Sequence, residues 1–308
     1  MGSIDPSQIN VPAFDNLPMG ENDPPYSAWG LWGKDDHLGT LNWLSPTTVK
    51  KAASEIQEGC RFSLNWCMSE PKTPGFGRHK HAFEHSIVGS GHVFDDTLVF
   101  NTQKSTQWDG LRHFAYQKEQ LFYNRTTRED IVDAPEGKLG IHWWHKAGCV
   151  TGRGILIDYW SYAEAQGKVY DPTSSYGVSF DDLMACFRWQ QQVSADNLEP
   201  RPGDILLIRL GFSARYYGLS EDQEREVGEA WPPASCGVKQ DIRLLQWLWD
   251  AKFAAVGGDC PGWEVFPVDE NAGFCFHEVL IAGWGCPIAE LLWLEDLAAS
   301  PANMIAVV

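Results

Sequence analysis

Three residues near position 110 combine side-chain types and a spacing that suit acid–base chemistry. If the segment from Gln107 to Asp109 is extended, these two side chains point to one side while Trp108 points to the other. Gly110 permits a tight turn, which would bring His113 back to the same side. A carboxylate and an imidazole so placed resemble an acid/base pair beside an aromatic wall, although Asp-x-x-x-His is also found as a purely structural pair.

The longer stretch around these residues resembles the signature of a known family. Residues 103–113 read QKSTQWDGLRH, which is similar to the H-x-G-T-H-x-D-x-x-x-H signature of the metal-dependent cyclase-like hydrolases, the family of bacterial kynurenine formamidase and isatin hydrolase. Thr106, Asp109 and His113 match it. Further similarities follow in the family's order, at residues 32–42, 153–158, 203–209 and 258–262, and at the late pair His277 and Glu290.

The resemblance implies a fold and a set of functional residues. The fold would be α/β, the swivelling β/β/α architecture of these hydrolases, in a single domain that assembles as a homo-oligomer. In the family, the signature histidines and aspartate bind one metal, and the aspartate can bridge to a second ion held by the late histidine and glutamate. By position, Asp109, His277 and Glu290 would be metal ligands, and His113 with Asp109 would be catalytic. A bound divalent ion lowers the pKa of its water and polarises a carbonyl group, which suits hydrolysis of amides and esters.

The sequence departs from the family at the first two signature histidines, which are Gln103 and Gln107 here. An amide offers zinc only a neutral oxygen, which is a weaker donor than an imidazole nitrogen. Both replacements keep polarity and reach, and this favours a pocket that has been reused. The sequence therefore leaves open whether a metal is bound.

Three functions follow from this departure. In the first, one Zn²⁺, Mn²⁺ or Fe²⁺ ion sits on Asp109, His277 and Glu290, and the protein hydrolyses a cyclic or aryl amide or ester. In the second, no metal is bound, and His113 works with Asp109 or Glu290 as a lyase, isomerase or cyclase on an aromatic or polyketide-like secondary metabolite. In the third, the pocket binds a planar small molecule without turning it over.

Several other residues are candidates for contacts with substrate. Besides the two glutamines, these are Trp108, Arg112 and Trp143. Trp143 belongs to the run His142–His145, which we expect on a loop where an aromatic pair flanked by imidazoles would grip a planar molecule. Four further histidines lie close together in the sequence: His79, His81, His85 and His92. They could form a metal site or line the pocket, but a solvated loop is the preferred interpretation.

The segments that position these residues alternate between helix and strand signals. Ser45 and Pro46 predict a helix start, and Gly59 predicts its end. The predicted helices cover residues 46–58, 180–190 and 241–252, and the predicted strands cover residues 97–100, 154–160 and 204–210. Because these elements interleave without a repeat or a clean linker, one α/β domain over residues 26–308 is expected.

Two segments fall outside this alternation. Residues 1–25 carry five prolines and little periodicity, which favours an extended arm that wraps a neighbouring subunit. Residues 213–235 include an acidic helical stretch at 220–229, and they form either a lid or a plain surface excursion.

Composition excludes some classes of partner. The 308 residues carry a formal charge of −17, and such a field repels phosphate backbones and anionic lipid surfaces. Nucleic-acid and membrane binding are therefore not expected, and a small molecule is the expected partner. The eight cysteines form no Cys-x-x-Cys pair, and the chain shows neither a signal peptide nor an apolar run long enough for a membrane span, so a cytoplasmic protein is predicted.

Overall fold

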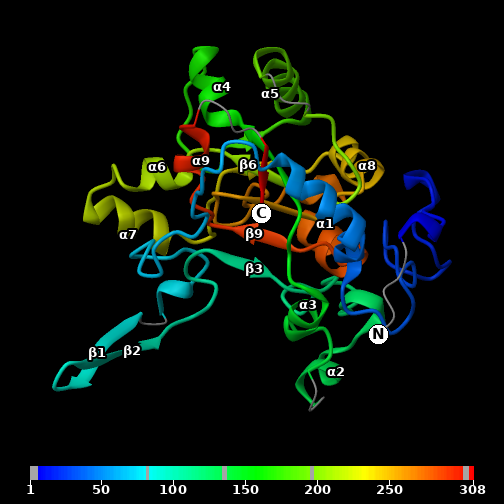
Figure 1. Cartoon of the computed structure of the whole chain (residues 1–308), viewed down its shortest axis with the longest axis horizontal. Coiled ribbons are helices and arrows are strands. Elements are labelled where there is room, and N and C mark those ends of the chain that lie inside the picture. The colour runs from blue at the N-terminus through cyan, green and yellow to red at the C-terminus, as the bar shows by residue number, and fades with distance from the viewer. Residues whose placement is uncertain (1–5, 81–82, 134–136, 195–197, 301–304) are drawn as a thin grey trace.

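A six-stranded mixed sheet forms the centre of the molecule in the computed structural model, which describes residues 6–80, 83–133, 137–194, 198–300 and 305–308 (Figure 1). Its strand order is β10-β4-β6-β8-β9-β3. The four inner strands run parallel, and the two edge strands β10 and β3 are antiparallel to their neighbours. The strands are β3 (Gln107–Asp109), β4 (Arg153–Asp158), β6 (Ile205–Arg209), β8 (Ala255–Gly258), β9 (Ile288–Glu290) and β10 (Ile305–Val307).

Both faces of this sheet are buried, as expected where parallel strands read as nearly continuous apolar runs. Alternate residues of β4 enter different cores: Ile155 and Ile157 pack with α5 (Phe180–Val193) and α8 (Ile242–Ala251), whereas Leu156 packs with Trp144 and other residues on the opposite face. The fold is therefore one mixed α/β domain, and the predicted architecture is confirmed.

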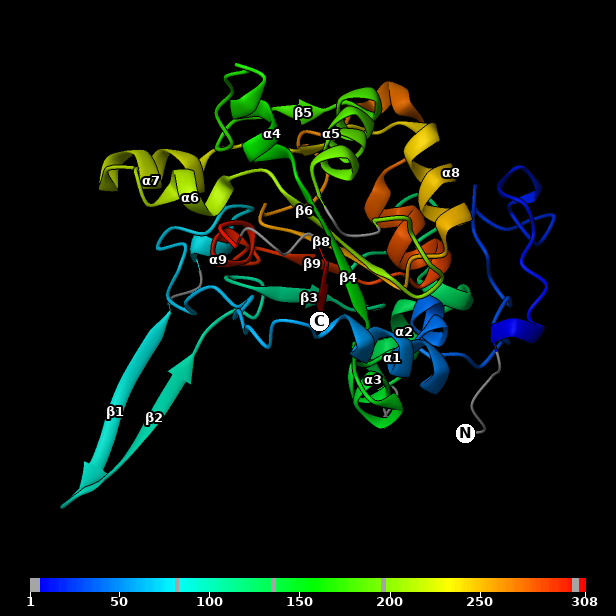
Figure 2. The ribbon, with the colours of Figure 1, turned by 45° about the horizontal axis from the view of Figure 1, so that its top comes forward.

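The remaining elements surround the sheet. Figures 1 and 2 show α4 and α5 over one face, α1 and α3 toward the other, and α6 with α7 at one end. The helices are α1 (Pro46–Ala52), α2 (Arg128–Val132), α3 (His142–Ala147), α4 (Tyr159–Ala165), α6 (Phe212–Tyr216), α7 (Glu221–Glu229) and α9 (Glu295–Ala298), and the small strands β5 (Gly177–Val178) and β7 (Gly237–Val238) pair with each other.

A long hairpin projects away from this body (Figure 2). Its strands β1 (Glu84–Ser90) and β2 (Val93–Val99) pair antiparallel and form a two-stranded sheet of their own. The strand predicted at residues 97–100 thus lies mostly in β2, outside the central sheet.

Two element boundaries and one element type differ from the sequence-based expectations. The helix over 46–58 ends at Ala52 and continues only as a 3₁₀ turn to Glu55. The strand over 154–160 ends at Asp158, because the Asp158 side chain accepts a hydrogen bond from the Ser161 amide and starts α4 there. The loop expected at 142–145 is the helix α3, which ends at Gly148 in a left-handed conformation.

Part of the N-terminal segment predicted as an arm packs on its own chain. Phe14 is buried and stacks on Tyr26, and the Pro12 carbonyl accepts a 2.9 Å hydrogen bond from the Trp249 indole of α8. Residues 1–5 lie outside the described residues. In the described part of the chain, no helix has the length and apolar character needed to cross a membrane.

Candidate metal centre and active site

The edge pair β3–β9 sets the base of the candidate site. In its register Gln107 lies opposite Glu290, and Asp109 lies opposite Ile288. Gln107 and Asp109 are buried while Trp108 between them is half-buried, which is the alternation expected of an extended segment. Two carboxylates, Asp109 and Glu290, are thereby brought into the interior on adjacent strands.

His277 completes this centre from another part of the chain. It immediately precedes a π-helical segment, Glu278–Trp284. Its Nδ1 lies 2.6 Å from Glu264 Oε1, and its backbone amide donates to the same oxygen at 2.9 Å. Its Nε2 lies 3.2 Å from Glu290 Oε1 and 3.7 Å from Asp109 Oδ2. Glu264 therefore orients the ring so that Nε2 faces both carboxylates.

His113 lies at the solvent side of the same cluster. Its amide donates to the Gly110 carbonyl at 2.8 Å, which closes the tight turn expected after Asp109. Its Nε2 is 3.6 Å from Asp109 Oδ2, and its side chain is 27% exposed whereas that of Asp109 is fully buried. Among these four residues, His113 is thus the one that an entering substrate can reach.

The two glutamines bind the carboxylates directly. Gln103 Nε2 donates to Asp109 Oδ1 at 2.7 Å, and Gln107 Nε2 donates to Glu290 Oε2 at 2.7 Å. Each amide therefore occupies one carboxylate oxygen and leaves the other to face His277. The Asp109 Oδ2 atom is buried and has no hydrogen-bond partner among the described residues.

This donor set fits a divalent cation. Ligand atoms of Asp109, His277 and Glu290 all lie within 4.8 Å of one another, and all three residues are buried. One imidazole and two carboxylates suit Zn²⁺, Mn²⁺ or Fe²⁺. Because a buried carboxylate oxygen without a partner is costly, the orphaned Asp109 Oδ2 marks the point where a cation would be stabilised.

The ionisable groups of the cluster are strongly perturbed. Burial, followed by the charge of Glu290, raises the pKa of Asp109 to about 6. Burial also lowers the pKa of His113, partly opposed by the charge of Asp109. Burial works against a charged His277, yet hydrogen bonds with Cys275, Glu264 and Glu290 raise its pKa well above the usual value. Without a cation His277 therefore carries a proton, and an ion binding at Nε2 would displace that proton.

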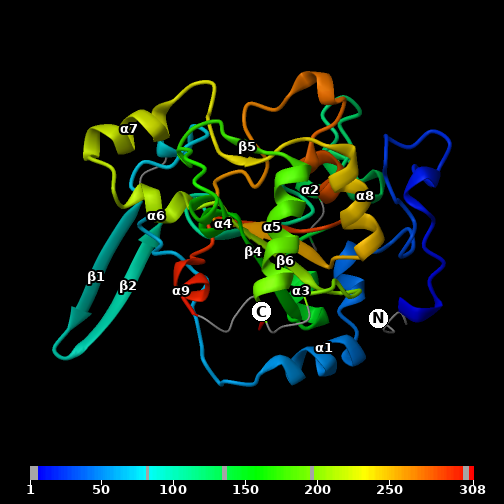
Figure 3. The same ribbon diagram turned by 90° about the horizontal axis from the view of Figure 1, so that it is seen from above.

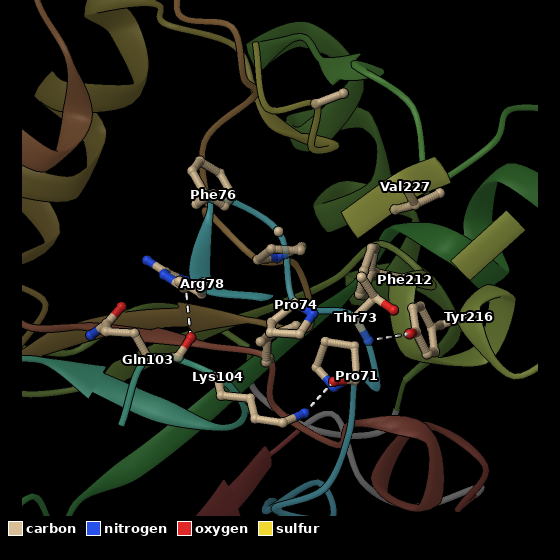
Figure 4. A pocket seen from close by; sticks show the side chains of 14 residues that line it. Pro71, Thr73, Pro74, Phe76, Arg78, Gln103, Lys104, Phe212, Tyr216 and Val227 are labelled. Carbon is tan, nitrogen blue, oxygen red and sulfur yellow. Dashed lines mark hydrogen bonds between the residues drawn. The ribbon is translucent and has the colours of Figure 1, made fainter. Parts of the chain in front are cut away.

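A small cavity adjoins the cluster at Gln103. Its volume is about 20 Å³, and Phe76, Phe212 and Tyr216 contribute to its largely apolar lining (Figure 4). Arg78 lies beside it, donates to the Gln103 carbonyl at 3.1 Å and stacks over Phe76. No carboxylate of the described residues forms an ion pair with Arg78, so its guanidinium is available to an anionic group.

The segment over 213–235 contributes to the wall of this cavity. Its residues Tyr216, Val227 and Ala234 line it together with Thr73. The backbone of Gly228 in α7 approaches the Thr73 carbonyl so closely that a Cβ there would lie 2.1 Å from that oxygen. This packing holds α7 against the loop that carries Arg78.

Other residues expected in the site lie apart from the cluster. The side chain of Arg112 donates to the Lys138 carbonyl, and Trp143 stacks on His37 with ring centroids 4.4 Å apart. Trp108 packs into the core beside Leu111. His85 pairs with Asp96 across the exposed hairpin, His81 lies outside the described residues, and no candidate ligand group among the described residues contains His79, His85 or His92.

Sequence reasoning did not single out Glu264 or Arg78. Glu264 closely follows residues 258–262, which resemble a loop of the family. Its position two residues beyond that loop was the available signal. Arg78 directly precedes the histidines of residues 79–92 and carried no distinguishing pattern.

Comparisons with known proteins identify the family and the fold of the chain. The family described as "Putative cyclase" matches residues 31–265. The solved structure of a protein described as a novel cyclase is 27% identical, with a TM-score of 0.73 and 88% of each chain covered. Isatin hydrolase A from Ralstonia solanacearum is 13% identical, with a TM-score of 0.51 over 84% of this chain and 89% of that one. An isatin hydrolase bound to the product analogue thioisatinate is 15% identical, with a TM-score of 0.52 over 82% and 88%. No curated protein sequence matches.

Proposed function

The chain belongs to the cyclase family, and we propose that it is a hydrolase of a cyclic or aryl amide or ester, assisted by one divalent ion on Asp109, His277 and Glu290. The observation that carries this proposal is the buried Asp109 Oδ2 atom, which faces two imidazoles and has no hydrogen-bond partner among the described residues. A cation at this point would balance two buried carboxylates that otherwise repel each other.

The ion, when bound, would polarise a carbonyl group and favour ionisation of water. His113 acts as the general base, since its lowered pKa keeps the imidazole neutral near pH 7 and its Nε2 lies 3.6 Å from Asp109 Oδ2 at the solvent side of the cluster. It accepts a proton from the attacking water and returns it to the leaving nitrogen or oxygen. Gln103 and Gln107 hold the carboxylates in place by their amide donors.

Aromatic side chains and Arg78 line the cavity beside Gln103, whose volume of about 20 Å³ holds about one water molecule. A substrate with an apolar body would contact these residues only if the walls of the cavity move apart to admit it. Hydrolysis of an amide or ester produces a carboxylate, which an arginine without an acidic partner would bind. The two isatin hydrolases share the fold, and their name is consistent with a cyclic substrate by analogy only.

A second candidate is favoured by the hydrogen bonds already present in the cluster. Asp109 and Glu290 each accept an amide N–H, and a protonated His277 between Glu264 and Glu290 offsets part of the negative charge without an ion. In that case His113 and Asp109 would perform an enolisation, dehydration or ring closure on an aromatic or polyketide-like metabolite. A pocket that only binds a planar molecule is the third candidate.

Metal analysis combined with the His113→Ala variant separates these functions. The purified protein is expected to contain one equivalent of Zn²⁺, Mn²⁺ or Fe²⁺, and a chelator should abolish hydrolysis of a panel of aryl amides, lactams and esters. His113→Ala should keep the metal and lose at least about 100-fold in kcat/KM, whereas the exposed His145→Ala control should remain active. Full activity after complete metal removal would refute the hydrolytic proposal, and full activity of His113→Ala would refute both enzymatic candidates.

A further inference from the structure

One wall of the cavity beside Gln103 is a loop without regular secondary structure, residues 71–77, which leads into Arg78. Figures 1, 2 and 3 show this loop, in light blue, beside α6 and α7. The cavity has a volume of about 20 Å³, whereas pockets for organic ligands usually enclose about 300–1,000 Å³. A substrate can therefore enter beside Gln103 only if one wall moves.

The first part of this loop is fixed to the body of the protein. Lys104 is buried, and its Nζ donates a hydrogen bond to the carbonyl of the buried Pro71. The Thr73 amide donates to the Tyr216 hydroxyl at 3.3 Å, and Gly228 of α7 packs closely against Thr73. The part of the loop that can move therefore lies beyond Thr73.

The second part, residues 75–78, contacts the body through two side chains. The Phe76 ring packs edge-on against Phe266, with ring centroids 5.1 Å apart. Arg78 donates to the Gln103 carbonyl at 3.1 Å. Release of these two side chains would free the segment to swing away from the cavity.

The backbone of this segment favours such a movement. Phe76 and Gly77 have φ angles of 58° and 73°, and this left-handed conformation is unfavourable for a phenylalanine. A Cβ placed on Gly75 or Gly77 would meet no other atom within 4 Å beyond the adjacent residues, so the turn is not wedged between other groups. The contacts of its two side chains therefore hold a strained turn against the body.

Both contacts lead directly to the candidate centre. The Phe266 ring lies 5.9 Å from the ring of His277, and the side chain of Gln103 donates to Asp109. Figure 4 shows the guanidinium of Arg78 and the side-chain amide of Gln103 extending in the same direction from their contact. Movement of the segment would thus open a route toward His277 and leave a free guanidinium beside it.

The charge of the segment indicates what it would bind. Residues 72–80 include Lys72, Arg78 and Lys80 and no acidic residue, in a chain whose net charge is −17. An acidic protein repels anions, so a local basic segment is where an anionic molecule would be attracted. A carboxylate binds a guanidinium through two charge-assisted hydrogen bonds, which are stronger than the bond to the neutral Gln103 carbonyl. A carboxylate would therefore displace that carbonyl.

We propose that residues 75–78 form a flap over the candidate centre and that Arg78 exchanges the Gln103 carbonyl for a carboxylate of the substrate. This inference rests on the proposed hydrolytic function and narrows its substrates to aryl or cyclic amides and esters that carry a carboxylate besides the cleaved bond. The aryl group of the substrate occupies the space opened between Phe76 and Phe266, and the carboxylate holds Arg78 in the open position.

Titration of the purified protein with benzoate and with its neutral analogue benzamide tests the exchange without turnover. Wild type should bind benzoate at least about tenfold more tightly, because only benzoate pairs with the guanidinium. Arg78→Gln should lose this preference, and Arg78→Lys should keep part of it, since lysine lacks the planar fork. The matched control Arg188→Gln, at an exposed position of α5, should bind like wild type. Repeating the titration after chelation excludes binding of benzoate to an ion.

Hydrogen exchange followed by mass spectrometry measures the flap itself. Benzoate should change the exchange of the amides of residues 75–80 in wild type and not in Arg78→Gln, whereas the amides of α6 should exchange alike with and without it. In steady-state kinetics, Arg78→Gln should raise KM about tenfold for substrates with a free carboxylate, with kcat and the KM of uncharged substrates unchanged.

The outcomes separate this proposal from the function on which it rests. Equal affinity of wild type for benzoate and benzamide, an unchanged preference in Arg78→Gln, or exchange of residues 75–80 that benzoate does not alter would overturn the flap. Absence of hydrolysis for every substrate tested would instead refute the hydrolytic function, and the titration and exchange results would still decide the role of Arg78.

Discussion

The candidate metal centre is held by neutral amide side chains on one side and by a charged carboxylate on the other. On the β3 side, Gln103 and Gln107 are neutral, and each amide donates to one carboxylate oxygen. On the opposite side, Glu264 is charged and holds His277, whose hydrogen bond keeps the pKa of Glu264 below its usual value despite burial. The amides thus stabilise the carboxylates without competing as ligands, while Glu264 orients the imidazole. This difference underlies the proposal of a single ion on Asp109, His277 and Glu290.

Removing the carboxylate that both sides share should have the largest effect. Asp109→Asn keeps the shape of the side chain and removes its charge, so the site loses a proposed ligand and the negative charge beside His113. We expect loss of the metal and a decrease in kcat/KM of about 1,000-fold or more. Steady-state kinetics and elemental analysis measure both quantities. Retention of stoichiometric metal in this variant would exclude Asp109 as a ligand.

Replacing the charged Glu264 by a neutral residue should have the second-largest effect. In Glu264→Gln the His277 ring keeps a hydrogen-bond partner but loses the carboxylate that raises its basicity. Metal affinity should decrease about 10- to 100-fold, as measured by competition with a coloured chelator. Glu270→Gln is the matched control, since Glu270 is exposed on the following loop. An unchanged affinity in Glu264→Gln would mean that the two sides do not differ in the way proposed.

Acidification tests the shared carboxylate without a mutation. Burial raises the pKa of Asp109 to about 6, so protons compete with the cation below that pH. Metal affinity should decrease by up to about tenfold per pH unit below pH 6. The folding stability of the metal-free protein should change in the opposite direction. A carboxyl group with a raised pKa contributes its full stability below about pH 4, and this contribution is lost as pH rises through 6.

A comparison of wild type with Asp109→Asn tests the predicted pH dependence of folding stability. Chemical unfolding of metal-free wild type and Asp109→Asn between pH 4 and pH 7 should show this pH-dependent component only in the wild type. Parallel profiles for the two proteins would contradict the raised pKa.

Replacing the neutral Gln107 by histidine should have the smallest effect. Gln107→His places an aromatic nitrogen beside Glu290, where the amide now donates. Zinc affinity should increase about fivefold, because imidazole is the better zinc ligand. Isothermal titration measures this change, and Gln107→Leu serves as the control that removes the amide without adding a ligand. Weaker zinc binding in Gln107→His than in Gln107→Leu would show that the amide side cannot accept a ligand.

Much of the fold followed from local patterns. The predicted helix over 180–190 and the helical stretch over 220–229 form α5 and α7, whose starts Ser179 and Ser220 cap, and the run DILLIRL forms β6. One error occurred where a nearby side chain ended an element early. The carboxylate of Asp158 caps α4, so the apolar run GILIDYW stops being a strand two residues before its end.

The strand predicted at residues 97–100 is present as part of β2, but its exposure was not predicted. A strand was expected at residues 97–100 because its residues are β-branched or apolar, and such residues usually mark a buried element. The structure instead places them on the surface of a projecting arm. Nothing in the local pattern distinguishes a buried strand from one on an exposed hairpin.

The sequence by itself determined the type of each candidate group and the local pairing of Asp109 with His113, because a short extended segment and one turn lie within seven residues. Only the tertiary structure decided which polar atoms meet. Gln107 binds Glu290 across 183 positions, and His277 is held by Glu264 from a separate loop. Such contacts depend on strand register and on the burial that makes each unpaired charge costly, and neither is encoded in the neighbours of a residue along the chain.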